Sequence, residues 1–153
     1  MNSKPLLEGS TRTDEPIEDE RSTAVGTLDS HALLAFRSRI EELKSLSAGW
    51  LDGKGVPPDH AGLDWLLASV ERVDTSEIPA PYLFPTPEGR VLAEWSLKRW
   101  SPSLEIDLAA KRGHWHALNL DTDEERTREI DLANPDNWRW LASQIRDMSG
   151  DRE

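Results

Sequence analysis

Residues 82–120 alternate apolar and polar side chains with a period of two, and Gly and Pro interrupt the alternation. The most regular run is 104–108, in which Leu, Ile and Leu alternate with Glu and Asp. A period of two places successive side chains on opposite faces of a strand, so these runs predict strands that are buried on one side. Short breaks containing Gly and Pro predict hairpin turns between them. We therefore expect an antiparallel β-meander of about four or five strands, the last near residues 128–132.

Three further segments have helical periodicity. Apolar residues recur at intervals of three and four in residues 33–46, 63–73 and 138–148. An amphipathic helix of this kind buries its apolar stripe against another layer. We therefore expect an α+β fold in which three helices pack on one face of the sheet. The residues predicted to begin these helices are Asp29 or Ser30, Asp59, and Asn134 followed by Pro135.

The first 26 residues differ in composition from the rest of the chain. They contain six acidic and three basic side chains and almost no apolar periodicity. Such a segment buries too little surface to offset the entropy lost on ordering. We therefore expect a disordered acidic N-terminal tail at residues 1–26, followed by a single α+β domain at residues 27–150. A chain of 153 residues is long enough for one such domain.

The charge and the cysteine count exclude several classes of function. The formal net charge is −11, whereas binding to a phosphate backbone requires clustered Lys and Arg, so we expect no direct contact with nucleic acid. The chain contains no Cys, which excludes disulfides, thiol nucleophiles and Cys-based zinc sites. No long apolar run is present, so we expect a cytoplasmic protein with no membrane partner. The negative electrostatic field around such an acidic chain favours a protein partner that is more basic than this chain.

The residues best suited to chemistry lie on two adjacent predicted strands. A four-residue loop before Gly113 would pair Asp107 with His114 and Glu105 with His116 on the polar face. Imidazole and carboxylate groups bind divalent metals and transfer protons, so a metal-binding protein or metal-assisted enzyme is our alternative hypothesis. Ordinary cross-strand pairs on a solvated face explain the same pattern. A one-residue change of register would separate the four side chains.

Residues 49–55 contain three Gly around Trp50 and Asp52. Dense glycines allow positive φ and can form a phosphate-binding nest. The Gly-Lys-Ser/Thr sequence and the preceding strand of a Walker loop are absent here, so nucleotide binding is not expected. We expect Trp50 to pack under an ordered loop and Asp52 to cap a turn. A small-molecule pocket at this loop stays open as a third hypothesis.

The chain contains seven Trp, and most of them are expected in the core. Trp138 belongs to the apolar stripe of the last predicted helix, so Trp140, two residues later, points elsewhere. Trp100 lies in a connection close to Pro102, where we expect it to be exposed. Exposed Trp residues are enriched among interface anchors. We therefore predict Trp100 and Trp140, together with Trp50 and Asp52, as partner-binding residues.

Several segments resemble, in the same order, a group of small, acidic, uncharacterised bacterial proteins. The segments are Gly49-Trp50-Leu51-Asp52-Gly53, Pro85-Thr86-Pro87-Glu88-Gly89, Glu94-Trp95-Ser96, Leu104-Glu105-Ile106-Asp107-Leu108 and Gly113-His114-Trp115-His116. The resemblance covers about residues 33–145. It implies a bacterial origin and a setting in accessory or defence-type operons, and it carries over no catalytic residues.

No catalytic signature is present elsewhere in the sequence; the Gly-x-Ser-x-Gly motif of a nucleophile elbow, for example, is missing. The sequence therefore predicts a non-enzymatic protein-binding module with no cofactor. An accessory, immunity or antitoxin-like protein fits this description.

Overall fold

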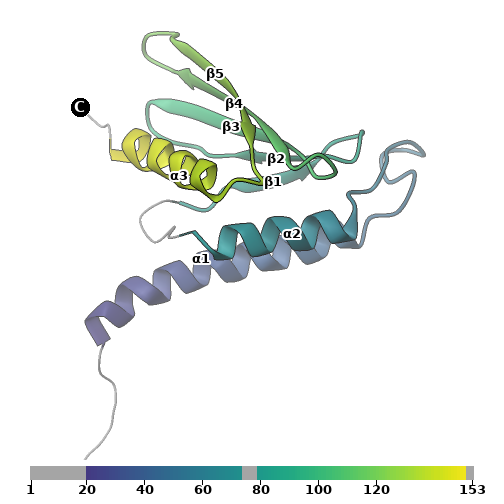
Figure 1. The fold of residues 1–153 in the computed structure, drawn as a ribbon, viewed down its shortest axis with the longest axis horizontal. Coiled ribbons are helices and arrows are strands. Elements are labelled where there is room, and N and C mark those ends of the chain that lie inside the picture. The colour runs from purple at the N-terminus through teal and green to yellow at the C-terminus, as the bar shows by residue number, and fades with distance from the viewer. Residues whose placement is uncertain (1–19, 74–78, 151–153) are drawn as a thin grey trace, which may run out of the picture.

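The computed structural model describes residues 20–73 and 79–150 (Figure 1). Within these residues the chain forms three helices and five strands, and each strand pairs antiparallel with its neighbour in sequence. The predicted α+β fold and antiparallel meander are therefore confirmed. The elements are α1 (Glu20–Lys44), α2 (His60–Glu71), β1 (Tyr82–Pro85), β2 (Val91–Glu94), β3 (Trp100–Asp107), β4 (Arg112–Asn119), β5 (Glu125–Asp131) and α3 (Pro135–Gly150).

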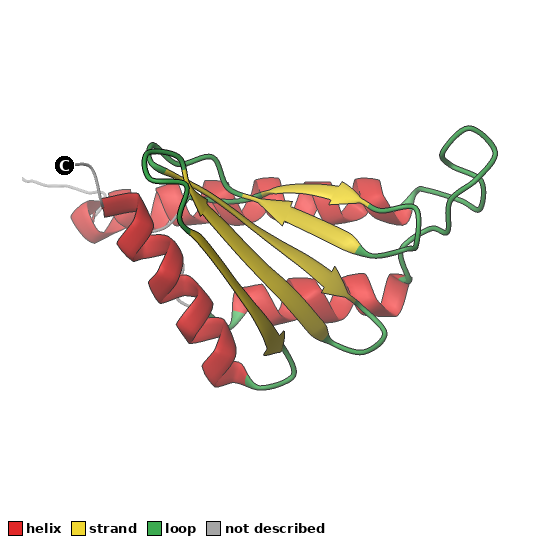
Figure 2. Cartoon of the chain, turned by 90° about the horizontal axis from the view of Figure 1, so that it is seen from above, coloured by secondary structure: helices red, strands yellow, loops and turns green. Residues whose placement is uncertain are grey.

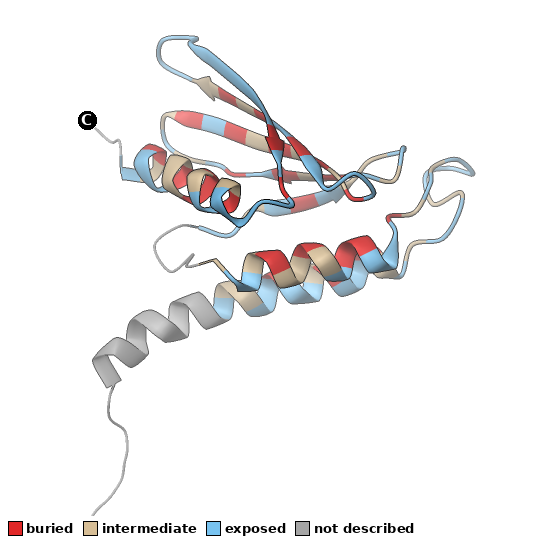
Figure 3. Ribbon diagram, viewed as in Figure 1, coloured by how far each residue is buried: buried red, intermediate tan, exposed pale blue. Residues whose placement is uncertain are grey.

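Burial alternates with the predicted period of two along β2, β3 and β4, as the banding in Figure 3 shows, whereas in β5 only Ile130 is buried. The strand register then assigns every side chain of the sheet to one of two faces. We call the buried side the inner face; it carries Leu83, Pro85, Val91, Ala93, Trp100, Pro102, Leu104, Ile106, Gly113, Trp115, Ala117, Asn119, Arg126, Arg128 and Ile130. We call the other side the outer face; it carries Tyr82, Phe84, Leu92, Glu94, Ser101, Ser103, Glu105, Asp107, Arg112, His114, His116, Leu118, Glu125, Thr127, Glu129 and Asp131.

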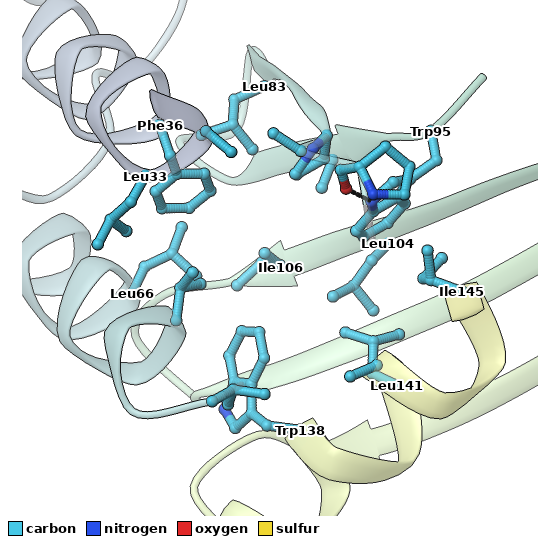
Figure 4. A pocket seen from close by; sticks show the side chains of 18 residues that line it. Leu33, Phe36, Leu66, Leu83, Trp95, Leu104, Ile106, Trp138, Leu141 and Ile145 are labelled. Atoms are coloured by element: carbon cyan, nitrogen blue, oxygen red, sulfur yellow. Dashed lines mark hydrogen bonds between the residues drawn. The ribbon is translucent and has the colours of Figure 1, made fainter. Parts of the chain in front are cut away.

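All three helices contribute side chains to the core that the inner face lines. Buried residues of α1, α2 and α3 form one cluster with the inner-face residues of the sheet. At the centre of this cluster is a cavity of about 70 Å³, shown in Figure 4. Its labelled lining includes Phe36 of α1, Leu66 of α2, Trp138 of α3 and Ile106 of β3. The cavity is thus the apolar junction at which the three helices meet the sheet.

The first helix begins earlier than predicted. It begins at Glu20, so residues 20–26 of the predicted tail belong to a helix, and residues 1–19 lie outside the described residues. Asp29 and Ser30, predicted as N-caps, lie inside α1 instead. Each costs a helix interior only about 0.5 kcal/mol relative to Ala, and no Pro interrupts residues 17–56. A residue type that favours N-caps is therefore a weak sign of where a helix begins.

The predicted starts of the other two helices are confirmed. The Asp59 side chain accepts a hydrogen bond from the Gly62 N–H at 2.8 Å and caps α2. The Asn134 side chain accepts one from the Asp136 N–H at 3.0 Å, and Pro135 is the first residue of α3. These bonds satisfy backbone donors that have no partner within the helix.

Polar contacts fasten α1 to α2 and to the edge of the sheet. Lys44 Nζ of α1 lies 2.5 Å from Asp64 Oδ1 of α2, and the hydrogen bond between them raises the pKa of the Lys44 ammonium. The Arg39 Nε–H donates to the backbone oxygen of Leu83 at 2.9 Å. This oxygen faces away from β2, because Thr86 N bonds to Arg90 O and the bonded pairs of an antiparallel ladder alternate. Arg39 therefore occupies the free edge of β1.

Tryptophan accounts for much of the core. Trp95, Trp100, Trp115 and Trp138 are all buried, which confirms that most of the seven Trp are core residues. Trp115 stands edge-to-face against Trp95 and Trp140, with ring centroids 6.3 and 6.0 Å away. Buried indole N–H groups require acceptors; the Trp138 N–H donates to the Leu132 oxygen at 2.8 Å, and the Trp95 N–H to the Pro79 oxygen at 3.1 Å.

The packing of α2 on the β3–β4 turn gives a test of the fold. A Cβ added at Gly62 would lie 2.7 Å from the Leu108 Cβ. Because a Cβ atom is bonded directly to the backbone, rotation of the Leu108 side chain would not relieve this contact. Overpacking of this kind costs about 1–3 kcal/mol, more than the gain of about 1 kcal/mol in helix propensity. We expect Gly62→Ala to lower the free energy of unfolding, measured by urea denaturation.

Gly150→Ala is the matched control, because an added Cβ there meets nothing within 4 Å. We expect it to change the free energy of unfolding by less than about 0.5 kcal/mol. If Gly62→Ala were as stable as the unmodified chain, the close approach of α2 to Leu108 would be wrong.

Candidate functional site

The outer face gathers most of the residues that the sequence singled out for chemistry. His114, His116, Glu105 and Asp107 all lie on it, as the alternation predicts. Their side chains are between one third and one half exposed. The face is strongly acidic, since it also carries Glu94, Glu125, Glu129 and Asp131.

The predicted pairing of these four residues is wrong by two positions. His114 lies opposite Glu105, His116 lies opposite Ser103, and Asp107 lies opposite Arg112. The loop that joins β3 to β4 is residues 108–111, one residue earlier than predicted. The Asp107 side chain supports this turn by accepting a hydrogen bond from the Ala110 N–H at 3.2 Å. A slip of two residues keeps every side chain on its predicted face, so the faces are right although the partners are not.

Space on the inner face explains the observed register. Gly113 lies opposite Ile106, and a Cβ at Gly113 would lie 2.8 Å from Leu104 Cδ1 and 3.0 Å from Leu132 Cδ1. These atoms are the ends of flexible side chains, so an added Cβ would require them to shift, and the observed register places a glycine where no shift is needed. Trp115 is then placed opposite Leu104, whereas the predicted pairing of Asp107 with His114 would have placed it opposite Ile106.

The two histidines bind carboxylates of β5, which the sequence prediction did not consider. His114 Nδ1 pairs with Glu129, and His116 Nε2 lies 2.9 Å from Glu125 Oε2. Glu105 and Asp107 instead face Arg90, whose guanidinium lies 3.4 Å from each carboxylate. Arg90 follows the Pro-Thr-Pro-Glu-Gly turn and approaches the outer face from that turn.

Residues 20–73 and 79–150 contain no group of three or more His, Asp or Glu residues that could hold a metal ion. The metal-binding alternative therefore has no preformed cluster in this part of the chain. The side chains that it invoked already have partners: His114 pairs with Glu129, His116 with Glu125, and Glu105 and Asp107 both pair with Arg90.

The glycine-rich loop is a small hairpin that uses its own backbone groups. Leu51 and Lys54 exchange two hydrogen bonds of 2.7 and 2.8 Å. Asp52 and Gly53 between them have φ values of 50° and 85°, as in a type I′ turn. Asp52 therefore forms the turn through its backbone conformation, rather than through the side-chain cap that we predicted.

Trp50 packs in this loop as predicted. Its indole N–H donates to the Val56 oxygen at 3.0 Å, and an added Cβ at Gly55 would lie 3.0 Å from the ring nitrogen. The N–H groups of Gly49, Leu51 and Gly53 all donate to carbonyls within the loop. They are therefore not arranged as a nest for an anion.

The predicted exposure of Trp100 is wrong. Trp100 is only 4% exposed, because it lies on the inner face, where the Arg126 guanidinium stacks 4.5 Å from its ring centroid. Trp140 is half-buried, between Trp115 and the Arg128 guanidinium, which lies 4.2 Å from the Trp140 ring centroid. Such cation–π contacts cover aromatic rings at the margin of a core. A Trp anchor for a partner is therefore not presented at position 100.

Among the Phe, Tyr and Trp residues that the structure describes, the exposed ones are two that sequence reasoning missed. Tyr82 is 65% exposed and Phe84 is 42% exposed, both on the outer face of β1. The half-buried Leu92 lies opposite Phe84, and Glu94 lies opposite Tyr82. We call Tyr82, Phe84 and Leu92 the aromatic corner. Their alternation with the buried Leu83 was the signal in the sequence that could have found them.

Comparison of the chain with protein-family models, with curated proteins and with solved structures gives no significant match. In the part of the chain that the structure describes, no helix has the length and apolar character needed to cross a membrane. The function is therefore inferred from the geometry and charge of the chain itself.

The histidine pairs on the outer face give a test of their role. Exposed pairs between neighbouring strands contribute about 0.2–1 kcal/mol. We therefore expect His114→Gln and His116→Gln each to lower the free energy of unfolding by less than about 1 kcal/mol. Urea denaturation at neutral pH measures this change.

Trp115→Ala, on the same strand but on the inner face, is the contrasting variant. It removes a side chain that is 1% exposed, and we expect a loss of about 3–5 kcal/mol. A loss of similar size in the histidine variants would show that the outer face has a larger structural role than its exposure indicates.

Proposed function

We propose that this protein is a non-enzymatic protein-binding module that docks a more basic partner on the outer face of its sheet. The observation that supports this most directly is the aromatic corner, an exposed apolar cluster beside an acidic surface. Exposed apolar clusters bordered by charge are typical of protein interfaces.

The aromatic corner supplies the apolar centre of such an interface. Tyr82 and Phe84 project from the same side of β1, and Leu92 continues the apolar surface onto β2. Aromatic side chains bury large areas with few rotatable bonds, so they dominate binding energy when a partner covers them. Burial of these two rings would therefore carry much of the affinity.

The acidic side chains supply the charged border. Glu94 lies opposite Tyr82, and Glu105 lies opposite Leu92, so carboxylates adjoin the corner on two strands. The net charge of −11 extends the negative field beyond these neighbours. Such a field accelerates association with a basic protein and disfavours acidic partners.

An accessory, immunity or antitoxin-like role in a bacterial defence-type operon is the setting that we propose for this binding. In that setting the partner is the product of a neighbouring gene with a basic surface. The resemblance in the order of motifs supports the bacterial setting. The negative charge of the outer face supports a partner whose binding surface is positively charged.

Coexpression with the product of the neighbouring gene, followed by calorimetric titration of the purified pair, tests the proposal. We expect Tyr82→Thr together with Phe84→Thr to weaken binding by at least about 30-fold, since hot-spot aromatics contribute about 2 kcal/mol or more. Thr keeps a high strand propensity, so the change removes the rings and preserves β1.

Leu34→Ala is the control, because Leu34 is 59% exposed on α1 and lies outside the outer face. We expect this variant to bind as tightly as the unmodified chain. Equal binding by the double Thr variant, or affinity that does not weaken with added salt, would contradict docking at an acidic aromatic surface. Sedimentation of the chain alone tests a second outcome, in which another copy of this chain, rather than a basic partner, covers the aromatic corner.

A further inference from the structure

A second cavity lies between α2 and α3 and has a volume of about 620 Å³. We call it the α2–α3 groove. Its walls include Trp65 of α2, Arg72 at the C-cap of α2, and Trp138, Arg139 and Arg146 of α3. Ligand sites typically occupy about 300–1,000 Å³, so the groove has the size of a small-molecule site.

The charge of the groove is opposite to that of the whole chain. Three arginines line it and, among residues 20–73 and 79–150, no Asp or Glu does, although the chain has 29 acidic and 18 basic residues. Arg139 and Arg146 are seven positions apart, so they lie on the same side of α3, two turns from each other. Lys111 does not line the groove, but its ammonium lies 5.8 Å from the Trp65 ring centroid.

Arg139 has a partner outside the groove. Its Nη1 lies 3.2 Å from Asp136 Oδ1, one turn earlier on α3. Both side chains are mostly exposed, at 64% and 81%. Exposed pairs of this kind contribute little, so a ligand anion can replace Asp136 at small cost.

The aromatic walls of the groove are fixed in position. The rings of Trp65 and Trp138 stand edge-to-face with centroids 6.4 Å apart. Trp138 is held by its hydrogen bond to the Leu132 oxygen, so its ring does not turn to admit a ligand. A fixed ring offers a flat apolar surface at little entropic cost.

We propose that the α2–α3 groove binds a small organic anion with a flat apolar body. The body lies against the half-buried Trp65, at the rim formed by the largely buried Trp138, and its carboxylate or phosphate is held by Arg72 and Arg139. Guanidinium groups match both of these anions through paired N–H donors. The acidic remainder of the chain does not prevent this, because charges more than about 8 Å away are screened at physiological salt.

Calorimetric titration of the full chain with three probes tests the proposal. The probes are 2-naphthoate, 2-naphthyl phosphate and the neutral 2-naphthalenemethanol, which share one ring system. We expect at least one of the two anions to bind about tenfold or more tightly than the alcohol. The tighter anion identifies whether the groove favours a carboxylate or a phosphate.

Two matched double variants locate the binding. Arg72→Gln with Arg139→Gln removes two charges from the groove, and Arg90→Gln with Arg112→Gln removes two from elsewhere on the chain. We expect the first to weaken anion binding about tenfold or more and the second to change it less than about twofold. Because the net charges of the two variants are equal, a general electrostatic effect would change both alike.

Arg139→Gln alone decides the question if the double variant loses its fold, as judged by circular dichroism. Arg139 is mostly exposed, so this single change leaves the fold intact, and we expect it to weaken anion binding severalfold. The proposal is overturned if neither anion binds saturably, if the alcohol binds as tightly as both anions, or if both double variants lose affinity equally.

Discussion

The burial of Trp115 is the packing constraint on which the sheet depends. Its ring is almost completely enclosed and stands edge-to-face against the rings of Trp95 and of Trp140 of α3. Because side chains alternate along a strand, a buried Trp115 forces its two neighbours, His114 and His116, onto the outer face. Cross-strand pairing then passes the same alternation to every other strand. The acidic surface is therefore a consequence of where one aromatic ring is buried.

The features that could be predicted from the sequence are those encoded by local periodicity. Alternation in residues 104–108 identified a strand and both of its faces, and Asp59 and Asn134 identified two helix starts. The register could not be obtained in this way, because a two-residue slip preserves every face. It depends instead on the space around Gly113, which residues distant in sequence define.

Burial of individual aromatic residues was also beyond local patterns. Trp100 looked exposed beside Pro102, yet Arg126 covers it from β5, twenty-six positions later in the chain. The α2–α3 groove has the same origin, since its arginines come from the end of α2 and from α3, which the whole sheet separates in sequence. Only the aromatic corner had a local signal, the alternation of Tyr82 and Phe84 with Leu83.

Charge is distributed unevenly over the molecule. Carboxylates gather on the outer face, whereas arginines line the α2–α3 groove. The two proposed binding surfaces involve different elements, β1 and β2 in one case and α2 and α3 in the other. A basic protein and a small anion could therefore be bound at the same time without competing for the same side chains.

The alternation along β5 has a further consequence for solubility. Glu125 and Glu129 project from the outer face of this edge strand, whereas Arg126 and Arg128 project from the inner face. If two copies paired through β5, side chains on a common face would meet, so Glu would oppose Glu and Arg would oppose Arg. With Arg39 bonded at the opposite edge, this pattern protects both ends of the sheet against polymerisation through exposed backbone groups.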